Sequence, residues 1–296
     1  MIVRDKPSVA DLFTALRGSV VPHIWRSLLV LVLVASAMVV VDRRLAVLPH
    51  LEGTAVTVFG IALSLFLGFR NNAAYDRWWE ARKLWGGLLA DLRALAREVE
   101  VFVPDPALRQ GLLRQALAFI HLHRANLRRL TGDAEVLARA PELAGHPHPP
   151  CGALDLMAAD LAAARSVGRI DGFGARSLTG RLASIALQQA GCERIAVTPL
   201  PYVYSLLIYR TTYLYCLLLP LALIQPAGWL TPVFVGIVAY VFLGLAEVTE
   251  ELSHPFGTTL NALPLDAICR AAEISLAPHL GEAAPPPLRP VNFHLG

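Results

Sequence analysis

The chain has few charged residues for its length. Lysine, arginine, aspartate and glutamate make up 17% of its 296 residues, whereas 55% are hydrophobic, and the mean hydropathy is +0.51. A soluble domain would have about a quarter charged residues, so part of the apolar surplus must face something other than a protein core. The formal net charge of +3 is too small and scattered to favour nucleic acid as a partner. The composition therefore favours an integral membrane protein.

Cysteine is also scarce, and its pattern matches no metal or disulfide motif. The four cysteines are Cys151, Cys192, Cys216 and Cys269. Their wide spacing predicts free thiols in a reducing compartment, with neither a disulfide framework nor a zinc site. His146 and His148 near Cys151 suggest a metal site, as do His121 and His123, but neither group has a second ligand pair at zinc-like spacing. We therefore expect no metal and no cofactor.

Four apolar segments could cross a bilayer. They are residues 27–41, 54–69, 202–224 and 229–246. At about 1.5 Å per residue, the first covers about 22 Å of a hydrocarbon layer roughly 30 Å thick. Segments of such marginal length suit helices that pack among other helices better than helices surrounded by lipid.

The basic residues predict the orientation of these segments. Four segments place both termini on one side, and residues 70–197 hold most of the arginines. Arg4, Lys6, Arg17 and Arg26 precede the first segment, whereas the short loop 225–228 has no basic residue. The positive-inside bias therefore predicts cytoplasmic termini and a cytoplasmic linker. Arg43 and Arg44, on the other side, argue mildly against this orientation.

The predicted fold class is all-α, a multi-pass membrane protein with a large cytosolic helical domain. In the linker, Leu88, Leu92, Leu95 and Val99 recur at steps of three and four, which is typical of an amphipathic helix. The expected parts are an N-terminal cytosolic segment, transmembrane helices 1–2, the cytosolic domain, transmembrane helices 3–4, and a C-terminal helix and tail. Their boundaries are 1–26, 27–69, 70–197, 198–246 and 247–296.

The second apolar segment passes into polar sequence with no turn signal between. From Phe69 the chain continues directly into Arg70 and Asn71, and then into two tryptophans and several charged residues. This pattern predicts one helix that leaves the bilayer without ending.

Small and bulky residues alternate round this helix. Gly60, Ser64 and Gly68 are four residues apart, and small residues in that register let helices pack closely in a membrane. The next stripe round the helix contains Ile61, Leu65 and Phe69, also four residues apart. In a symmetric ring these side chains would form three stacked apolar rings that gate by dewetting. Ordinary packing against lipid or another helix explains the same period equally well.

Below the membrane the same stripe continues through Asp76 and Glu80. If both face a central axis, each forms an acidic ring that concentrates cations. Arg77 would reverse the sign if it faced inward instead, and salt bridges within the domain are an equal alternative for these charges.

Arg210 lies about two turns inside the third apolar segment. A charge at that depth is costly and seldom faces lipid. We expect a structural ion pair between Arg210 and one acidic residue. The candidates are Asp76, Glu80, Glu247, Glu250 and Glu251.

Three separated motifs resemble the bacterial bestrophin-like proteins. They are GFRNNAAYDRWWEARKLWG at 68–86, QAGCERIAVTPLPYVYS at 189–205 and AEVTEELSHPFGTTLNALPLD at 246–266. The resemblance covers residues from about 20 to 275, with the motifs in the family's order. It implies a homopentamer in the inner membrane, with four spans per protomer and one axial pore lined by the second helix. The family's hydrophobic neck maps onto Ile61, Leu65 and Phe69, and a second, cytosolic constriction is expected between Ile170 and Leu182.

One departure from the family concerns calcium. Animal bestrophins have a dense acidic run after Pro-Phe-Gly that binds calcium, but here Pro255-Phe256-Gly257 is followed by Thr258 and the next acid is Asp266. Calcium prefers six to eight oxygen ligands, several of them carboxylates. We therefore expect no calcium gating through this segment.

The predicted function is passive conduction of monovalent ions, with the self-assembled chain and the lipid bilayer as partners. Acidic rings at Asp76 and Glu80, and bacterial relatives expected to pass sodium, favour a cation channel. The alternative is an anion channel of the same architecture, since animal members conduct chloride. A membrane-anchored enzyme built on residues 247–254 finds no support in a catalytic triad order, an HExxH helix or a phosphate loop. A secondary transporter would show inverted repeats, and none is visible.

Overall fold

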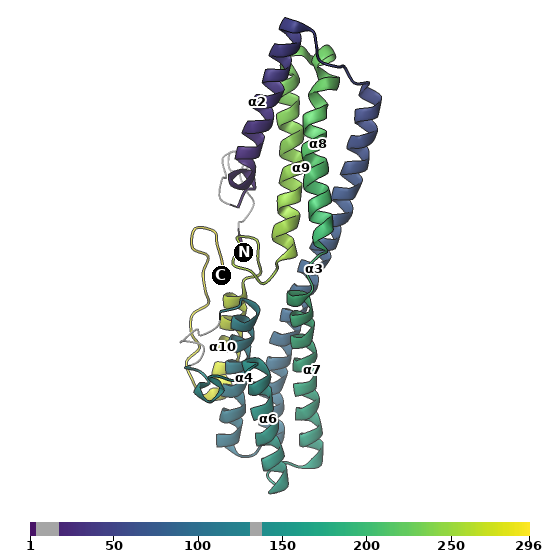
Figure 1. Cartoon of the computed structure of the whole chain (residues 1–296). Coiled ribbons are helices and arrows are strands. Elements are labelled where there is room, and N and C mark those ends of the chain that lie inside the picture. Colours follow the sequence, from purple (N-terminus) through teal and green to yellow (C-terminus); the bar gives the residue numbers. More distant parts are fainter. Residues whose placement is uncertain (4–17, 131–137) are drawn as a thin grey trace. The chain divides into compact units, whose positions relative to one another are not determined.

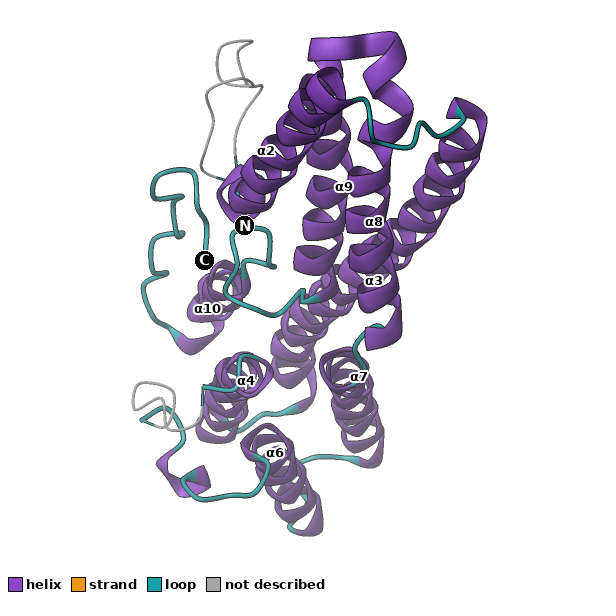
Figure 2. Ribbon diagram, turned by 45° about the horizontal axis from the view of Figure 1, so that its top comes forward, coloured by secondary structure: helices purple, strands orange, loops and turns teal. Residues whose placement is uncertain are grey.

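The computed structural model describes residues 1–3, 18–130 and 138–296 (Figure 1). Arg4, Lys6 and Arg17, on which part of the orientation prediction rests, lie outside this range. Within it every regular element is a helix, as Figure 2 shows. The helices are α2 (Val21–Leu45), α3 (Gly53–Phe102), α4 (Pro106–Leu127), η1 (Pro141–Leu143), α6 (Pro149–Ser166), α7 (Gly172–Val197), α8 (Tyr202–Ala227), η2 (Gly228–Leu230), α9 (Thr231–Ser253) and α10 (Leu265–Leu280). The all-α prediction is confirmed.

The chain divides into two compact units. The apolar unit contains α2, α3 as far as Trp78, α8, η2 and α9. The polar unit contains α3 from Trp79 onward, α4, η1, α6, α7 and α10, with the ends of the chain. The helix α3 is therefore the one element that contributes to both units, in the part of the chain that the structure describes.

In the apolar unit α2, α8 and α9 lie side by side with the first half of α3, and η2 joins α8 to α9 (Figures 1 and 2). All four helices supply side chains to one buried core. Its members include Ile24, Leu31, Ala35, Val56, Leu63, Leu67, Ile208, Tyr215, Leu219, Val235, Ala239 and Leu243. Because lipid rather than water would surround such helices, close packing rather than hydrophobic burial holds them together.

Three stretches of the described chain are long and apolar enough to cross a membrane. They are Val21–Leu45, a window in Gly53–Phe102, and Tyr202–Ser253, in which η2 separates two α-helices. Each predicted apolar segment lies in one of these stretches, so the prediction of a membrane protein with several apolar helices is supported. The exact number of crossings stays a prediction.

The polar unit is a helical bundle with its own core. Leu88, Leu92, Leu95 and Val99 are fully or almost fully buried, which confirms the amphipathic stripe expected in the linker. Gly191 of α7 allows a close approach to α3, because a Cβ there would lie 2.8 Å from a Leu84 methyl group. The side chain of Asp171 caps α7 by accepting a hydrogen bond from the Gly174 amide at 2.6 Å.

Candidate functional site

The first half of α3 has one covered face and one uncovered face. Val56, Leu63 and Leu67 are at most 7% exposed and belong to the apolar core. Ile61 and Leu65 are 57% exposed, and Phe69 is 71% exposed. Because steps of four residues stay close to the 3.6-residue period of a helix, Ile61, Leu65 and Phe69 lie on the same face of α3, which the protomer leaves uncovered. Whether this face lines a pore stays a prediction.

The three small residues of α3 differ in their surroundings. A Cβ on Gly60 would lie 2.6 Å from the hydroxyl oxygen of Tyr215 on α8, so Gly60 allows these two helices to approach. Gly68 has no atom within 4 Å of that position. Ser64 is exposed, and its hydroxyl donates to the Gly60 carbonyl at 2.8 Å. Within the protomer only Gly60 makes the predicted close helix contact; packing at Ser64 and Gly68 would require another chain.

Polar contacts hold α3 directly below Phe69. The Arg70 guanidinium donates to the Ser205 hydroxyl at 2.6 Å and to the Glu250 carboxylate at 2.8 Å. The Arg70 side chain is only 5% exposed. Two turns later along α3, Arg77 Nε donates to the Ser253 carbonyl at 2.8 Å. The polar residues that follow the apolar run therefore connect α3 by hydrogen bonds to α8 and to the last turns of α9. These contacts also turn Arg77 toward α9.

The two acids predicted to line a vestibule have different partners. Glu80 accepts a hydrogen bond from the Arg194 guanidinium on α7 at 2.7 Å. This is the salt bridge within the domain that the sequence left open as an alternative to an acidic ring. Asp76 is exposed and makes no ion pair with any described residue. Farther along α3, Arg82 and Lys83 are exposed as well. The exposed charges near the end of the stripe are therefore one unpaired acid, Asp76, and one base, Lys83, because Arg82 lies about 100° farther round the helix.

The ion pair expected for Arg210 does not form among the described residues of one protomer. Arg210 is exposed on α8, and no described carboxylate lies within ion-pair distance of it. Glu250 pairs with Arg70 instead, and Glu247 accepts from the Tyr209 hydroxyl at 3.4 Å. The acids near the end of α9 thus have other donors, which periodicity alone could not reveal.

The start of α7 has one conspicuous exposed side chain. In the range expected to hold the cytosolic constriction, Ile170, Leu178 and Leu182 are at most 8% exposed, whereas Phe173 is 82% exposed. Phe173 is therefore the large apolar residue in this range whose side chain the protomer leaves exposed. The sequence could not single it out, because it does not show which of the four side chains are buried.

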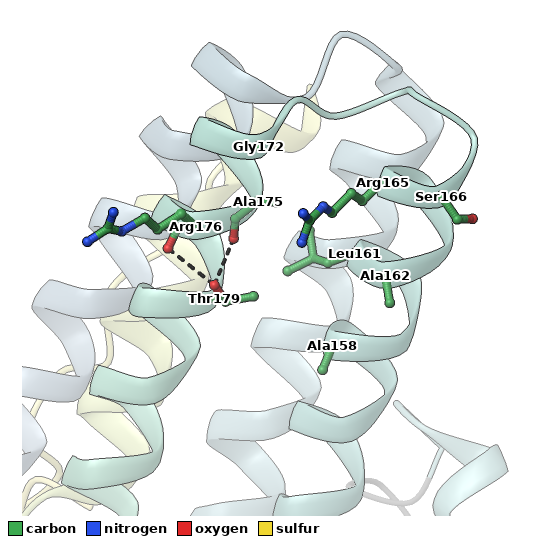
Figure 3. A pocket seen from close by; sticks show the side chains of 9 residues that line it. All are labelled: Ala158, Leu161, Ala162, Arg165, Ser166, Gly172, Ala175, Arg176 and Thr179. Atoms are coloured by element: carbon green, nitrogen blue, oxygen red, sulfur yellow. Dashed lines mark hydrogen bonds between the residues drawn. The ribbon is translucent and has the colours of Figure 1, made fainter.

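A groove of about 730 Å³ lies between α6 and α7 (Figure 3). Arg165 extends into the space between the two helices, whereas the side chain of Arg176 points away from it. Thr179 closes part of the wall, and its hydroxyl donates to the Ala175 carbonyl at 2.8 Å. The remaining lining residues are Ala158, Leu161, Ala162, Ser166 and Gly172.

The histidines have structural surroundings. His148 caps α6 by accepting from the Cys151 amide at 3.3 Å. His121 lies 2.9 Å from a Glu273 carboxylate oxygen, and burial lowers the pKa of His121 to about 4. Burial, with a smaller effect of His148, lowers the pKa of His123 to about 3. Among the described residues no group of three or more histidine, cysteine or acidic side chains could hold a metal ion.

Comparisons with known proteins match nearly the whole chain. The model of the family described as Bacterial/Fungal Bestrophin protein matches residues 1–278. A voltage-dependent anion channel-forming protein of Mesorhizobium japonicum is 46% identical, over 99% of this chain and 97% of its own length. A protein of the same description from Salmonella typhi is 39% identical over 93% of both chains. The crystal structure of a bacterial bestrophin homologue from Klebsiella pneumoniae has a TM-score of 0.83 and 32% identity, and the match covers 88% of this chain and 99% of that one.

Proposed function

The chain belongs to the bacterial and fungal bestrophin family, and from this premise we propose that five copies surround one axial pore and conduct monovalent ions passively. The membrane is the bacterial inner membrane, each copy crosses it four times, and both termini and the polar unit lie in the cytoplasm. No step of this function requires a catalytic group, a metal or a cofactor.

The uncovered face of α3 is the observation that supports this proposal most strongly. Ile61, Leu65 and Phe69 stand four residues apart on that face. Five such helices round an axis would stack three apolar rings, and such a constriction excludes water until it widens. Phe173 would form the second constriction where ions leave toward the cytoplasm.

We propose that the permeant ion is an anion, which replaces the cation predicted from the sequence. Two described relatives have names that specify anion channels. The cation prediction rested on two acidic rings, and one of them is lost because Glu80 is paired with Arg194. Exposed Lys83 lies on the same stripe as the unpaired Asp76 and offsets its charge, so the strongly acidic lining that would favour cations is lost. Asp76 alone favours the cation alternative.

Reconstitution in liposomes tests the proposal. Flux should appear without ATP and without a gradient of a second ion. In asymmetric NaCl the reversal potential should lie close to the equilibrium potential of chloride. A reversal potential close to the equilibrium potential of sodium would select the cation alternative. The absence of flux from correctly assembled protein would contradict the proposal that the protein is a channel.

A matched pair of variants tests the neck. Leu65→Ala should change conductance or selectivity, because it removes one apolar ring. Leu214→Ala, on α8 and 50% exposed, makes the same chemical change on a helix outside the proposed pore and should leave both unchanged. Equal behaviour of the two variants would remove Leu65 from the neck.

A further inference from the structure

Arg210 lacks a partner in a place where arginine needs one. It lies eight residues after the start of α8 at Tyr202, about 12 Å along the helix axis, and it is exposed. An unpaired guanidinium near the hydrocarbon region costs several kcal/mol unless it reaches a polar group. Since no described carboxylate meets it, the partner of Arg210 is outside the described protomer.

A second arginine lies at a similar level on the neighbouring helix. The Ser27 hydroxyl on α2 and the Tyr213 hydroxyl on α8 are hydrogen bonded at 2.8 Å. Arg210 precedes Tyr213 by three residues and so lies on the same side of α8, and Arg26 directly precedes Ser27. Arg26 is exposed too and, like Arg210, forms no ion pair with a described carboxylate, so two guanidiniums lie on the N-terminal side of one hydrogen bond between helices.

Arg26 lies at the level where the membrane surface is expected on α2. Arg26 is the last charged residue before the apolar part of α2, which begins at Ser27. Its guanidinium lies 5.6 Å from the ring centroid of Trp25, which is 49% exposed. Tryptophan and tyrosine concentrate where acyl chains meet headgroups. Long arginine side chains extend toward that layer while their stems stay in apolar surroundings.

We propose that Arg26 and Arg210 bind the phosphate group of an anionic lipid in the leaflet on the side of the N-terminus. A guanidinium forms two parallel, charge-assisted hydrogen bonds with a phosphate, and two guanidiniums from adjacent helices suit a headgroup that bears a full negative charge. The acyl chains of the lipid would lie along the exposed apolar face of α8, next to Leu207 and Leu214.

The unpaired Asp76 of a second copy fits less well as the partner. The contact of Arg70 with Ser205 fixes the relative depth of α3 and α8, which run antiparallel. Arg210 lies five residues from Ser205 in one direction, and Asp76 lies six residues from Arg70 in the other, so about 16 Å separates them along the membrane normal. Copies related by rotation about that normal keep the same depths, which puts Asp76 of another copy out of reach.

Lipid titration of the full-length protein in a neutral detergent tests the site. Phosphatidylglycerol should raise the unfolding temperature and be retained in native mass spectrometry, whereas phosphatidylcholine should do neither. Arg26→Gln and Arg210→Gln should each weaken retention about tenfold, since one charge-assisted interaction is lost. Arg44→Gln, an exposed position at the other end of α2, is the matched control and should retain lipid normally.

Three outcomes would overturn the proposal. Equal retention by Arg210→Gln and Arg44→Gln would remove the site. A similar stabilisation by inorganic phosphate would show a free-anion site rather than a lipid site. Loss of the oligomer in Arg210→Gln without any lipid present would show that a second copy meets this arginine. None of these readouts measures ion flux, so they are independent of the proposed conduction.

Discussion

Replacing Gly60 by alanine should destabilise the apolar unit. The new Cβ would lie 2.6 Å from the Tyr215 hydroxyl oxygen and 3.0 Å from its Cζ, and such overpacking costs about 1–3 kcal/mol. Alanine also gains about 1 kcal/mol over glycine inside a helix. Gly68→Ala makes the same change in the same helix, with nothing within 4 Å. The difference between the two variants therefore isolates the overpacking cost, because the helix-propensity gain is common to both.

The free energy of unfolding can be measured by denaturant titration of the purified protein in detergent, followed by tryptophan fluorescence. Gly60→Ala should be less stable than Gly68→Ala by about 1–3 kcal/mol. Tyr215→Phe removes the hydroxyl group and leaves the ring carbon at 3.0 Å as the nearest atom. Combining it with Gly60→Ala should therefore recover part of the loss, with a coupling of about 1 kcal/mol in a double-mutant cycle.

Equal stabilities of the two alanine variants would refute the close contact between α3 and α8. A larger loss in Gly68→Ala would show that packing between copies at Gly68 is tighter than the contact at Gly60. A coupling of zero with Tyr215→Phe would show that the hydroxyl group is not what the new methyl group meets.

Three further predictions concern acid stability, ion selection and the exit. Folding lowers the pKa of His123 from its ordinary 6.5 to about 3. The unfolded chain therefore binds one more proton than the folded chain below pH 6.5, and the stability of the fold should decrease as the pH falls below about 6.5. His123→Leu should reduce the difference in unfolding temperature between pH 7 and pH 4, and an unchanged difference would contradict this role of His123. Asp76→Asn should move the reversal potential further toward chloride, whereas Glu80→Gln should not, because Glu80 is already paired; equal shifts would contradict the assignment. Phe173→Ala should raise single-channel conductance, while Leu187→Ala, 71% exposed on the same helix, should not; unchanged conductance in both would move the exit elsewhere.

The covered and uncovered faces of α3 could be predicted from the sequence because they depend on helical period alone. An unbroken run of 50 residues without proline keeps its phase, so the four-residue spacing of Ile61, Leu65 and Phe69 is enough to place them on one face. The buried stripe that includes Leu88 and Leu95 follows from the same rule. Family resemblance then supplied the meaning of the uncovered face.

The partners of the charged side chains could not be predicted in this way. Glu80 and Arg194 are 114 positions apart in the chain, and no local pattern indicates that they meet. The same is true of Arg70 with Glu250, 180 positions apart, and of the missing partner of Arg210. The sign of the permeant ion depends on which acids remain unpaired. For Glu80 the sequence left the acidic ring and the salt bridge as equal alternatives, and the structure has the salt bridge with Arg194.

The length of α3 should resist evolutionary insertion and deletion. Its buried positions follow steps of three and four residues from Val56 to Val99, over a helix about 75 Å long. One inserted residue between Phe69 and Trp85 would turn everything after it by about 100°, so that residues now facing one core would face outward. Seven inserted residues add nearly two whole turns and restore the original direction. Natural variants of this helix should therefore keep its length or differ by close to a whole number of turns, such as about 7, 11 or 18 residues.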